Sequence, residues 1–147
     1  MAVFAVENLS CLRGQNLIFS GLNLTLGDGQ ALVLAGPNGS GKSSLLRVLA
    51  GLIPPFVGGL SWEGENVSDD RQAHADRLHY VGHANAIKAP LSVRENLAFW
   101  AGLNDVPQDI DRALNAFELM PIADTPGRIL SSGQRRRLNL ARLGLGQ

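Results

Sequence analysis

The pattern of apolar and polar residues predicts strands in the first half of the chain. Loose alternation in Ala2–Glu7 and regular alternation in Leu22–Leu26 (LNLTL) indicate strands with one buried face. The segment Gln30–Ala35 (QALVLA) is almost continuously apolar, which is typical of a strand buried on both faces. Two further predicted strands, the first with a turn inside it, are Leu60–Val67 and Leu78–Val81.

Helical periodicity dominates the second half of the chain. One helix is already predicted earlier, at Lys42–Ala50, with Gly51 at its C-terminal end. After Pro90 the spacing predicts three more helices, at about residues 93–102, 108–120 and 132–143. A strand-rich half followed by a helical half predicts an α/β core and a helical subdomain. We expect the first part to cover about residues 1–82 and the helical part about residues 83–143.

Charge and composition exclude several classes of protein. The 147 residues carry 13 basic and 13 acidic side chains, so the net charge is zero, whereas nucleic-acid and membrane-surface binders show a basic excess. An apolar content of 45% is too high for a disordered chain. The single cysteine, Cys11, fits a reducing compartment. With neither a signal peptide nor a membrane span predicted, we expect a soluble chain that reaches a membrane only through a partner.

A glycine-rich segment between the predicted buried strand and the first helix has the spacing of a phosphate-binding loop. Gly36–Ser43 (GPNGSGKS) fits G-x-x-x-x-G-K-[ST] at every fixed position. Glycines let backbone N–H groups approach phosphate oxygens, and the following helix directs its positive end at them. We expect Lys42 to reach the β- and γ-phosphates of ATP and Ser43 to bind Mg²⁺. The residues expected to bind nucleotide are Gly36, Pro37, Asn38, Gly39, Ser40, Gly41, Lys42, Ser43 and Ser44.

A second motif, Leu130–Gln134 (LSSGQ), opens the last predicted helix, where Ser132 is expected to act as the cap. Together with the phosphate loop, it resembles the signature motif of ABC-type ATPases. The resemblance implies an α/β fold with a P-loop NTPase (RecA-like) core, an antiparallel β subdomain and a helical ABC-specific subdomain. It also implies a head-to-tail dimer of ATP-binding domains, in which the signature motif meets the ATP of the partner. The residues expected to make that contact are Ser131, Ser132, Gly133 and Gln134.

Two longer segments narrow the resemblance. CLRGQNLIFSGLNLTL, starting at Cys11, and LHYVGHANAIKAPLSVRENLAFW, starting at Leu78, resemble the haem-exporter ATP-binding subunit of cytochrome c maturation. This implies integral-membrane transporter subunits as partners, at the cytoplasmic face of a bacterial inner membrane. Two alternatives stay open: the ATPase of another exporter, for lipid, metal or drug, and a soluble ABC protein that acts on ribosomes or DNA. The neutral charge argues against the second alternative.

Some positions depart from the family pattern. His83 stands where most ABC ATPases carry a glutamine near Mg²⁺ and the attacking water, and either a nucleotide-site role or a packing role fits it. Arg13 lies near the position of the usual adenine-stacking aromatic residue and is a weak candidate for that contact. His79 and His83 share one face of the predicted strand, but without a third ligand a metal site is not expected. Arg135–Arg137 follow the signature motif and either face solvent or raise the local positive potential.

The resemblance also implies two carboxylates and a histidine beyond the signature motif, which residues 1–147 do not supply. Leu119–Asp124 is a poor substitute because it contains Pro121 and no glutamate follows it. We therefore expect a fragment, incomplete at its C-terminus, that does not hydrolyse ATP efficiently. A missing central strand would leave apolar surface exposed, so we expect aggregation. A non-hydrolysing nucleotide-binding remnant stays open as a further alternative.

Overall fold

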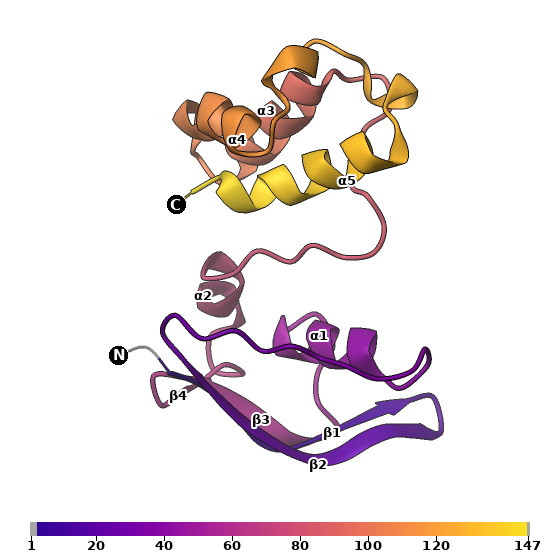
Figure 1. Cartoon of the computed structure of the whole chain (residues 1–147). Helices are drawn as coiled ribbons and strands as arrows, with labels where there is room; N and C mark the ends of the chain where they lie inside the picture. Colours follow the sequence, from indigo (N-terminus) through magenta and orange to yellow (C-terminus); the bar gives the residue numbers. More distant parts are fainter. Residues whose placement is uncertain (1–2, 147) are drawn as a thin grey trace. The chain divides into compact units, whose positions relative to one another are not determined.

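The computed structural model describes residues 3–146 and divides them into two compact units (Figure 1). The first unit ends at Leu78 and the second begins at His79. Each unit has its own hydrophobic core. Ala2, where the first predicted strand begins, lies outside the described residues.

The first unit is built on an antiparallel sheet of four strands in the order β2-β1-β3-β4. The long strands β1 (Val3–Arg13) and β2 (Asn16–Gly27) form a hairpin whose two-residue turn contains Gly14 at φ +62°. The strands β3 (Val57–Trp62) and β4 (Glu65–Asn66) form the second hairpin, with its turn at the predicted position. The alternation of apolar and polar residues therefore places the apolar side chains on one face of the sheet, which packs on a core. Bulges in β1 interrupt this alternation where they shift its register.

Helix α1 (Lys42–Leu49) covers that side of the sheet, as Figure 1 shows. Its apolar residues recur at helical spacing, and the buried ones meet the strands. The buried residues of this core are Val6, Leu9, Cys11, Leu45, Val48, Leu60 and Val67. A short helix that the sequence did not predict, α2 (Arg71–Asp76), packs against the same core. Its buried His74 stacks on Phe4 and places Nε2 2.9 Å from the Leu49 carbonyl oxygen at the C-terminal end of α1.

The strands predicted at Gln30–Ala35 and Leu78–Val81 are wrong as elements of this structure. Neither segment takes part in a ladder, and Val33 is 84% exposed. An apolar run becomes a strand only when a neighbouring strand pairs with its N–H and C=O groups. None of the described segments pairs with either apolar run. Both runs therefore have the composition of a strand but lack the ladder hydrogen bonds that would make them one.

The second unit is helical and encloses a separate core. Its three α-helices are α3 (Val93–Leu103), α4 (Ile110–Ala116) and α5 (Ser132–Ala141). Four single 3₁₀ turns connect and extend them: η1 (Pro107–Asp109), η2 (Met120–Ile122), η3 (Gly127–Ile129) and η4 (Arg142–Gly144). The buried residues of this core are Val93, Leu97, Ala101, Ala113, Leu114, Leu119, Ala123, Leu130, Leu138, Ala141 and Leu145.

The helix predicted at about residues 108–120 is shorter than expected. It ends at Ala116 because Glu118 takes a left-handed conformation, with φ +54°, and Pro121 then begins a new turn. Next to this region, the guanidinium of Arg142 lies 3.5 Å from the centre of the Trp100 ring, and burial lowers the pKa of that arginine. None of the described helices combines the length and the apolar character that a bilayer crossing requires.

Candidate functional site

The phosphate loop has the backbone shape that its glycines permit. Gly36, Gly39 and Gly41 take φ angles of +149°, +85° and +93°, which L-residues with a side chain rarely adopt. The Ser40 N–H donates to the Pro37 carbonyl oxygen at 3.3 Å and closes a turn inside the loop. A Cβ on Gly41 would lie only 2.5 Å from Ile18 Cγ2, so β2 presses directly on the base of the loop. The loop conformation thus depends on both the glycine positions and the neighbouring strand.

Helix α1 begins at this loop with its first N–H groups free. Gly41 is the N-cap residue and offers no side chain, and the first turn contains no acidic residue. Leu45 N–H makes the first intrahelical bond, to the Gly41 carbonyl oxygen at 2.8 Å. Among the described residues, none accepts a hydrogen bond from the N–H groups of Lys42, Ser43 or Ser44. Such a helix end, carrying the positive pole of the helix dipole, is suited to bind an anion.

The ammonium group of Lys42 is folded over the loop. Its Nζ donates to the carbonyl oxygens of Gly36 at 2.8 Å and Pro37 at 2.7 Å, and to Ser40 Oγ at 3.3 Å. These acceptors are neutral, whereas phosphate oxygens are charged and make stronger hydrogen bonds with a cation. A bound polyphosphate would therefore compete well for the Lys42 ammonium at the place where the loop already holds it.

A hollow of about 300 Å³ lies against the loop and is lined by Arg13 and Ile18 from the β1–β2 hairpin. Its remaining lining residues are Asn38, Gly39, Gly41, Lys42, Ser43 and Ser44. The structure thus brings Arg13 beside the phosphate loop, close enough to share one hollow with it. Sequence reasoning missed Ile18, because its position depends on the register of β2 and no motif marks it.

The residues around the loop fit Mg²⁺ only as a partner of bound phosphate. No group of three or more His, Cys, Asp or Glu side chains within residues 3–146 is arranged to hold a metal ion. The Ser43 hydroxyl is exposed at the start of α1, beside the free N–H groups. Mg²⁺ commonly binds through few protein ligands together with substrate phosphates and water. Ser43 can supply the one protein oxygen that such a site needs.

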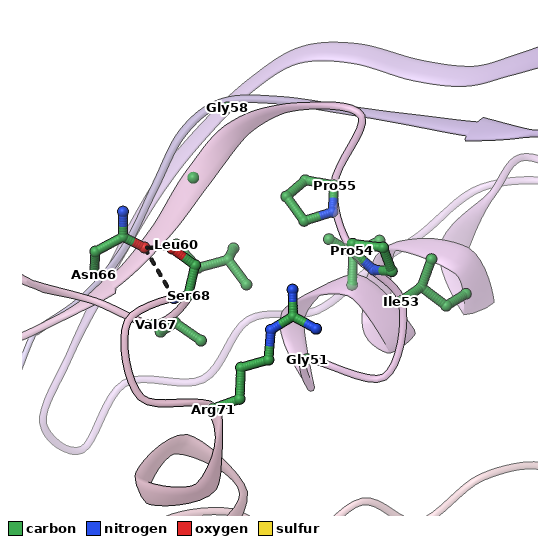
Figure 2. A pocket seen from close by; sticks show the side chains of 12 residues that line it. Gly51, Ile53, Pro54, Pro55, Gly58, Leu60, Asn66, Val67, Ser68 and Arg71 are labelled. Atoms are coloured by element: carbon green, nitrogen blue, oxygen red, sulfur yellow. Dashed lines mark hydrogen bonds between the residues drawn. The ribbon is translucent and has the colours of Figure 1, made fainter.

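A second hollow in the first unit lies at the other end of α1 and is shown in Figure 2. It is bounded by the Pro54–Pro55 turn, by β3 and by Arg71, and its volume is about 90 Å³. Sites for small organic ligands usually measure about 300 to 1,000 Å³. The hollow beside the phosphate loop is therefore the better candidate for a nucleotide.

The signature motif forms the beginning of α5, but its cap is Ser131 and not Ser132 as predicted. The Gln134 N–H donates to Ser131 Oγ at 3.2 Å, and the Ser131 N–H donates to Gln134 Oε1 at 2.8 Å. This reciprocal pair is a capping box, which requires Ser or Thr three residues before Glu or Gln. Only Ser131 has that spacing to Gln134, so the sequence contained the signal.

The capping box leaves part of the helix end open. It uses the N–H groups of Ser131 and Gln134, and among the described residues none accepts from those of Ser132 and Gly133. A Cβ on Gly133 would have no neighbour within 4 Å, and its φ is not positive. Nothing in the described part of the chain therefore requires a glycine there. Open space and two free donors at a helix N-terminus are what a ligand from outside the chain would need.

The three arginines after the motif bind different segments of the second unit. Arg135 donates to the carbonyl oxygens of Leu130 and Arg128, at 3.1 and 3.0 Å. Arg136 reaches the Gly82 carbonyl oxygen at 3.4 Å, and Arg137 pairs with Glu118 at 3.3 Å. Each guanidinium thus makes a hydrogen bond within the second unit, while Arg135 and Arg136 are also exposed to solvent.

His83 is exposed beside Arg136. Both line a hollow together with Val81, Gly82 and Asn85. Since residues 78–81 do not form a strand, His79 and His83 share no strand face, and that part of the prediction is wrong. Arg136 places its guanidinium in this hollow and donates to the Gly82 carbonyl oxygen, next in sequence to His83.

Comparison with known proteins agrees with this geometry. The ABC transporter family matches residues 19–147. The "Cytochrome c biogenesis ATP-binding export protein CcmA" of Rhodospirillum rubrum is 57% identical, over 97% of this chain and 61% of the relative. Its counterpart from Paramagnetospirillum magneticum is 54% identical, over 97% of this chain and 68% of the relative. The chain thus spans about 61 to 68% of the length of these relatives.

Solved structures show the same fold at lower sequence identity. A putative ABC transporter ATP-binding protein from Pyrococcus furiosus has a TM-score of 0.84 at 22% identity, covering 96% of this chain and 69% of that one. An ATP-binding subunit of another ABC transporter has a TM-score of 0.82 at 19% identity, covering 95% of this chain and 60% of that one. The family match and the identities above establish that the chain belongs to the ABC transporter family.

Proposed function

We propose that the chain is the ATP-binding part of an ABC transporter that couples ATP hydrolysis to haem export or delivery in cytochrome c biogenesis. One observation carries the proposal: two helices, α1 and α5, begin at family motifs and present free N–H groups that suit phosphate. The relatives named for cytochrome c biogenesis support the choice of process.

In this proposal ATP lies on the phosphate loop. Lys42 leaves the Gly36 and Pro37 carbonyl oxygens and donates to the β- and γ-phosphates, while the free N–H groups at the start of α1 hold the same oxygens. Ser43 supplies its hydroxyl to Mg²⁺, which reduces the negative charge on the phosphates when it is bound. Arg13, on the rim of the same hollow, stacks its guanidinium plane on the adenine.

The signature motif acts on a second ATP molecule. In a head-to-tail dimer, Ser131–Gln134 of one chain meet the γ-phosphate bound by the other chain. The free N–H groups of Ser132 and Gly133, and the open space at Gly133, support this role. His83 takes part in the same reaction at the position where the family usually has glutamine. The dimer works with integral-membrane subunits at the cytoplasmic face of the bacterial inner membrane.

Binding of ATP and turnover of ATP are separate parts of the proposal and need separate measurements.

The chain offers a matched pair of variants for the binding test, because Lys42 and Lys88 are its only lysines. Both change the net charge equally, but Lys88 Nζ lies over the Phe99 ring and outside the phosphate loop. A fluorescent ATP analogue should bind the wild type and Lys88→Ala, and Lys42→Ala should lose that binding. Equal binding by all three proteins would contradict the assignment of the loop.

The proposed role in cytochrome c biogenesis is tested in a bacterium whose own ATP-binding subunit for this pathway has been deleted. Expression of the protein that contains this chain should restore haem-stained c-type cytochromes, and Lys42→Ala should not. If the wild-type protein is produced and binds ATP but restores no cytochrome c, the haem assignment is wrong. In that case, co-purification with other membrane subunits would identify an exporter of another class.

A further inference from the structure

Asn96 on α3 forms hydrogen bonds through both the oxygen and the nitrogen of its side-chain amide. It is 3% exposed, and its Oδ1 accepts from the Lys88 N–H at 2.8 Å. Its Nδ2 faces the carbonyl oxygens of Lys88, Leu91 and Ser92, at 3.1, 3.1 and 2.9 Å. One buried amide group thus fixes both ends of the loop formed by residues 88–92.

The other side of loop 88–92 is held by the turn at residues 126–128. The Gly127 N–H donates to the Leu91 carbonyl oxygen at 2.8 Å, and the Arg128 N–H donates to that of Ala89 at 2.9 Å. Leu91 therefore receives a hydrogen bond from each side, one from Asn96 and one from Gly127. An antiparallel bridge between Ser92 and Pro126 adds to the contact.

Gly127 allows this approach because it has no side chain. A Cβ there would lie 3.0 Å from Ile87 Cγ2 and 3.1 Å from the Lys88 carbonyl oxygen. Its φ is not positive, so space and not backbone conformation explains the glycine. An alanine would have to push loop 88–92 away by a few tenths of an ångström.

The turn at 126–128 leads directly into the signature motif. The η3 turn ends at Ile129, the buried Leu130 follows, and Ser131 is the N-cap of α5. Arg135 from the first turn of α5 donates back to the Arg128 carbonyl oxygen at 3.0 Å. Hydrogen bonds thus run without a gap from Asn96 through loop 88–92 to the beginning of α5.

We propose that Asn96 is a positioning residue for the signature motif and that it acts through loop 88–92 and Gly127. This inference rests on the proposed role of Ser131–Gln134 at the ATP of the partner chain. Asn96 touches no nucleotide itself. It sets where the free N–H groups of Ser132 and Gly133 are presented, and with them the geometry in which ATP hydrolysis takes place.

The expected signature of this role is a loss of turnover without a loss of ATP binding. ATP first binds to the phosphate loop, whereas the signature motif acts only when the dimer closes on it. A misplacement of about 1 Å at a reacting site can lower a rate by about 100-fold. For Asn96→Ala we expect kcat to fall ten- to 100-fold, while the Kd for ATP at the phosphate loop changes less than twofold.

The test uses the transporter assembled with its membrane subunits. Asn104→Ala is the matched control, because Asn104 also lies at α3 and bonds a backbone carbonyl oxygen, that of Trp100, but is exposed. Gly127→Ala is a second, independent variant that disturbs the same contact from the other side and removes no hydrogen-bonding group. Turnover, ATP binding and hydrogen exchange of the Gly127 and Arg128 amides are measured for each protein.

Asn96→Ala and Gly127→Ala should each lower kcat and speed exchange of the two amides, and Asn104→Ala should do neither. The double variant should be no slower than the slower single variant, since both break one contact. If the rate losses of the two single variants multiply in the double variant, the inference is wrong. Normal turnover in Asn96→Ala would also overturn it. Should Asn96→Ala fail to assemble, Gly127→Ala alone decides by the same criteria.

Gly133→Ala separates this inference from the proposed function. If Gly133→Ala turns over ATP normally, the signature motif does not act on ATP and both ideas are wrong. If Gly133→Ala is slow while Asn96→Ala and Gly127→Ala are normal, the proposed function stands and the positioning role of Asn96 is wrong.

Discussion

Gly41 is the glycine of the phosphate loop whose replacement the structure constrains most tightly. It is the N-cap residue of α1, at φ +93°, and a Cβ there would lie 2.5 Å from Ile18 Cγ2. Cγ2 is attached directly to the branched Cβ of Ile18, so it can move away only if χ1 rotates or β2 shifts. We therefore expect Gly41→Ala to destabilise the first unit through two separate effects.

The size of each effect can be set from general values. A residue with a Cβ in the left-handed region costs about 1–2 kcal/mol. An overpacked methyl group adds about 1–3 kcal/mol. Gly41→Ala should thus lower the free energy of unfolding by about 2–5 kcal/mol, which is a large share of the stability of an ordinary domain.

Gly39→Ala is the matched control for the backbone effect. Gly39 lies two residues earlier at φ +85°, and a Cβ there would have no neighbour within 4 Å. It should therefore show only the backbone cost of about 1–2 kcal/mol. Urea unfolding of the nucleotide-free protein, followed by circular dichroism, measures both differences.

A suppressor distinguishes the steric effect from other causes. Ile18→Ala removes Cγ2, so Gly41→Ala should cost about 1–3 kcal/mol less in the Ile18→Ala background than in the wild type. Equal destabilisation by Gly39→Ala and Gly41→Ala, with the same cost of Gly41→Ala in both backgrounds, would refute the claim that β2 presses on the base of the loop.

Three further predictions concern the ends of α1 and α5. Lys42→Ala should abolish binding of a fluorescent ATP analogue and leave the unfolding midpoint nearly unchanged, because its acceptors Gly36 and Pro37 are exposed to water. Ser131→Ala should lower stability in urea by about 1 kcal/mol through loss of the N-cap, and a change below about 0.3 kcal/mol would contradict the capping box. His74→Phe should keep the stacking on Phe4 but lower thermal stability by about 1 kcal/mol, because the Leu49 carbonyl oxygen loses its donor.

Local sequence signals predicted the elements that depend on neighbours in the chain. Helices α1 and α3 were predicted within a few residues of their observed ends. Only the outer parts of β1 and β2 were predicted, as two shorter strands, and the turn that joins them was not. The local signal is alternation of apolar and polar residues for the strands, a preceding glycine-rich loop for α1, and helical periodicity for α3. The conformation of residues 36–41 follows from glycine spacing in the same way.

Long-range pairing could not be predicted in this way. Gln30–Ala35 has the composition of a buried strand, yet composition does not say which segment supplies the hydrogen bonds, and none of the described ones does. The contacts of Arg136 with Gly82 and of Asn96 with loop 88–92 likewise join segments whose meeting depends on how the helices pack. Asn96 stands out in the sequence only as a polar residue at a buried helical position, and that signal fits many roles.

Two glycines of the second unit show that the structure gives a reason for a glycine that the sequence alone does not. Gly127 and Gly133 lie six residues apart and look alike in the sequence, but a Cβ would be crowded at Gly127 and free at Gly133. Gly127→Ala should therefore lose both stability and turnover. Gly133→Ala should gain up to about 1 kcal/mol, because alanine is the better helix former, and should still lose turnover. Opposite signs in stability with the same sign in turnover would assign one glycine to internal packing and the other to a ligand outside the chain.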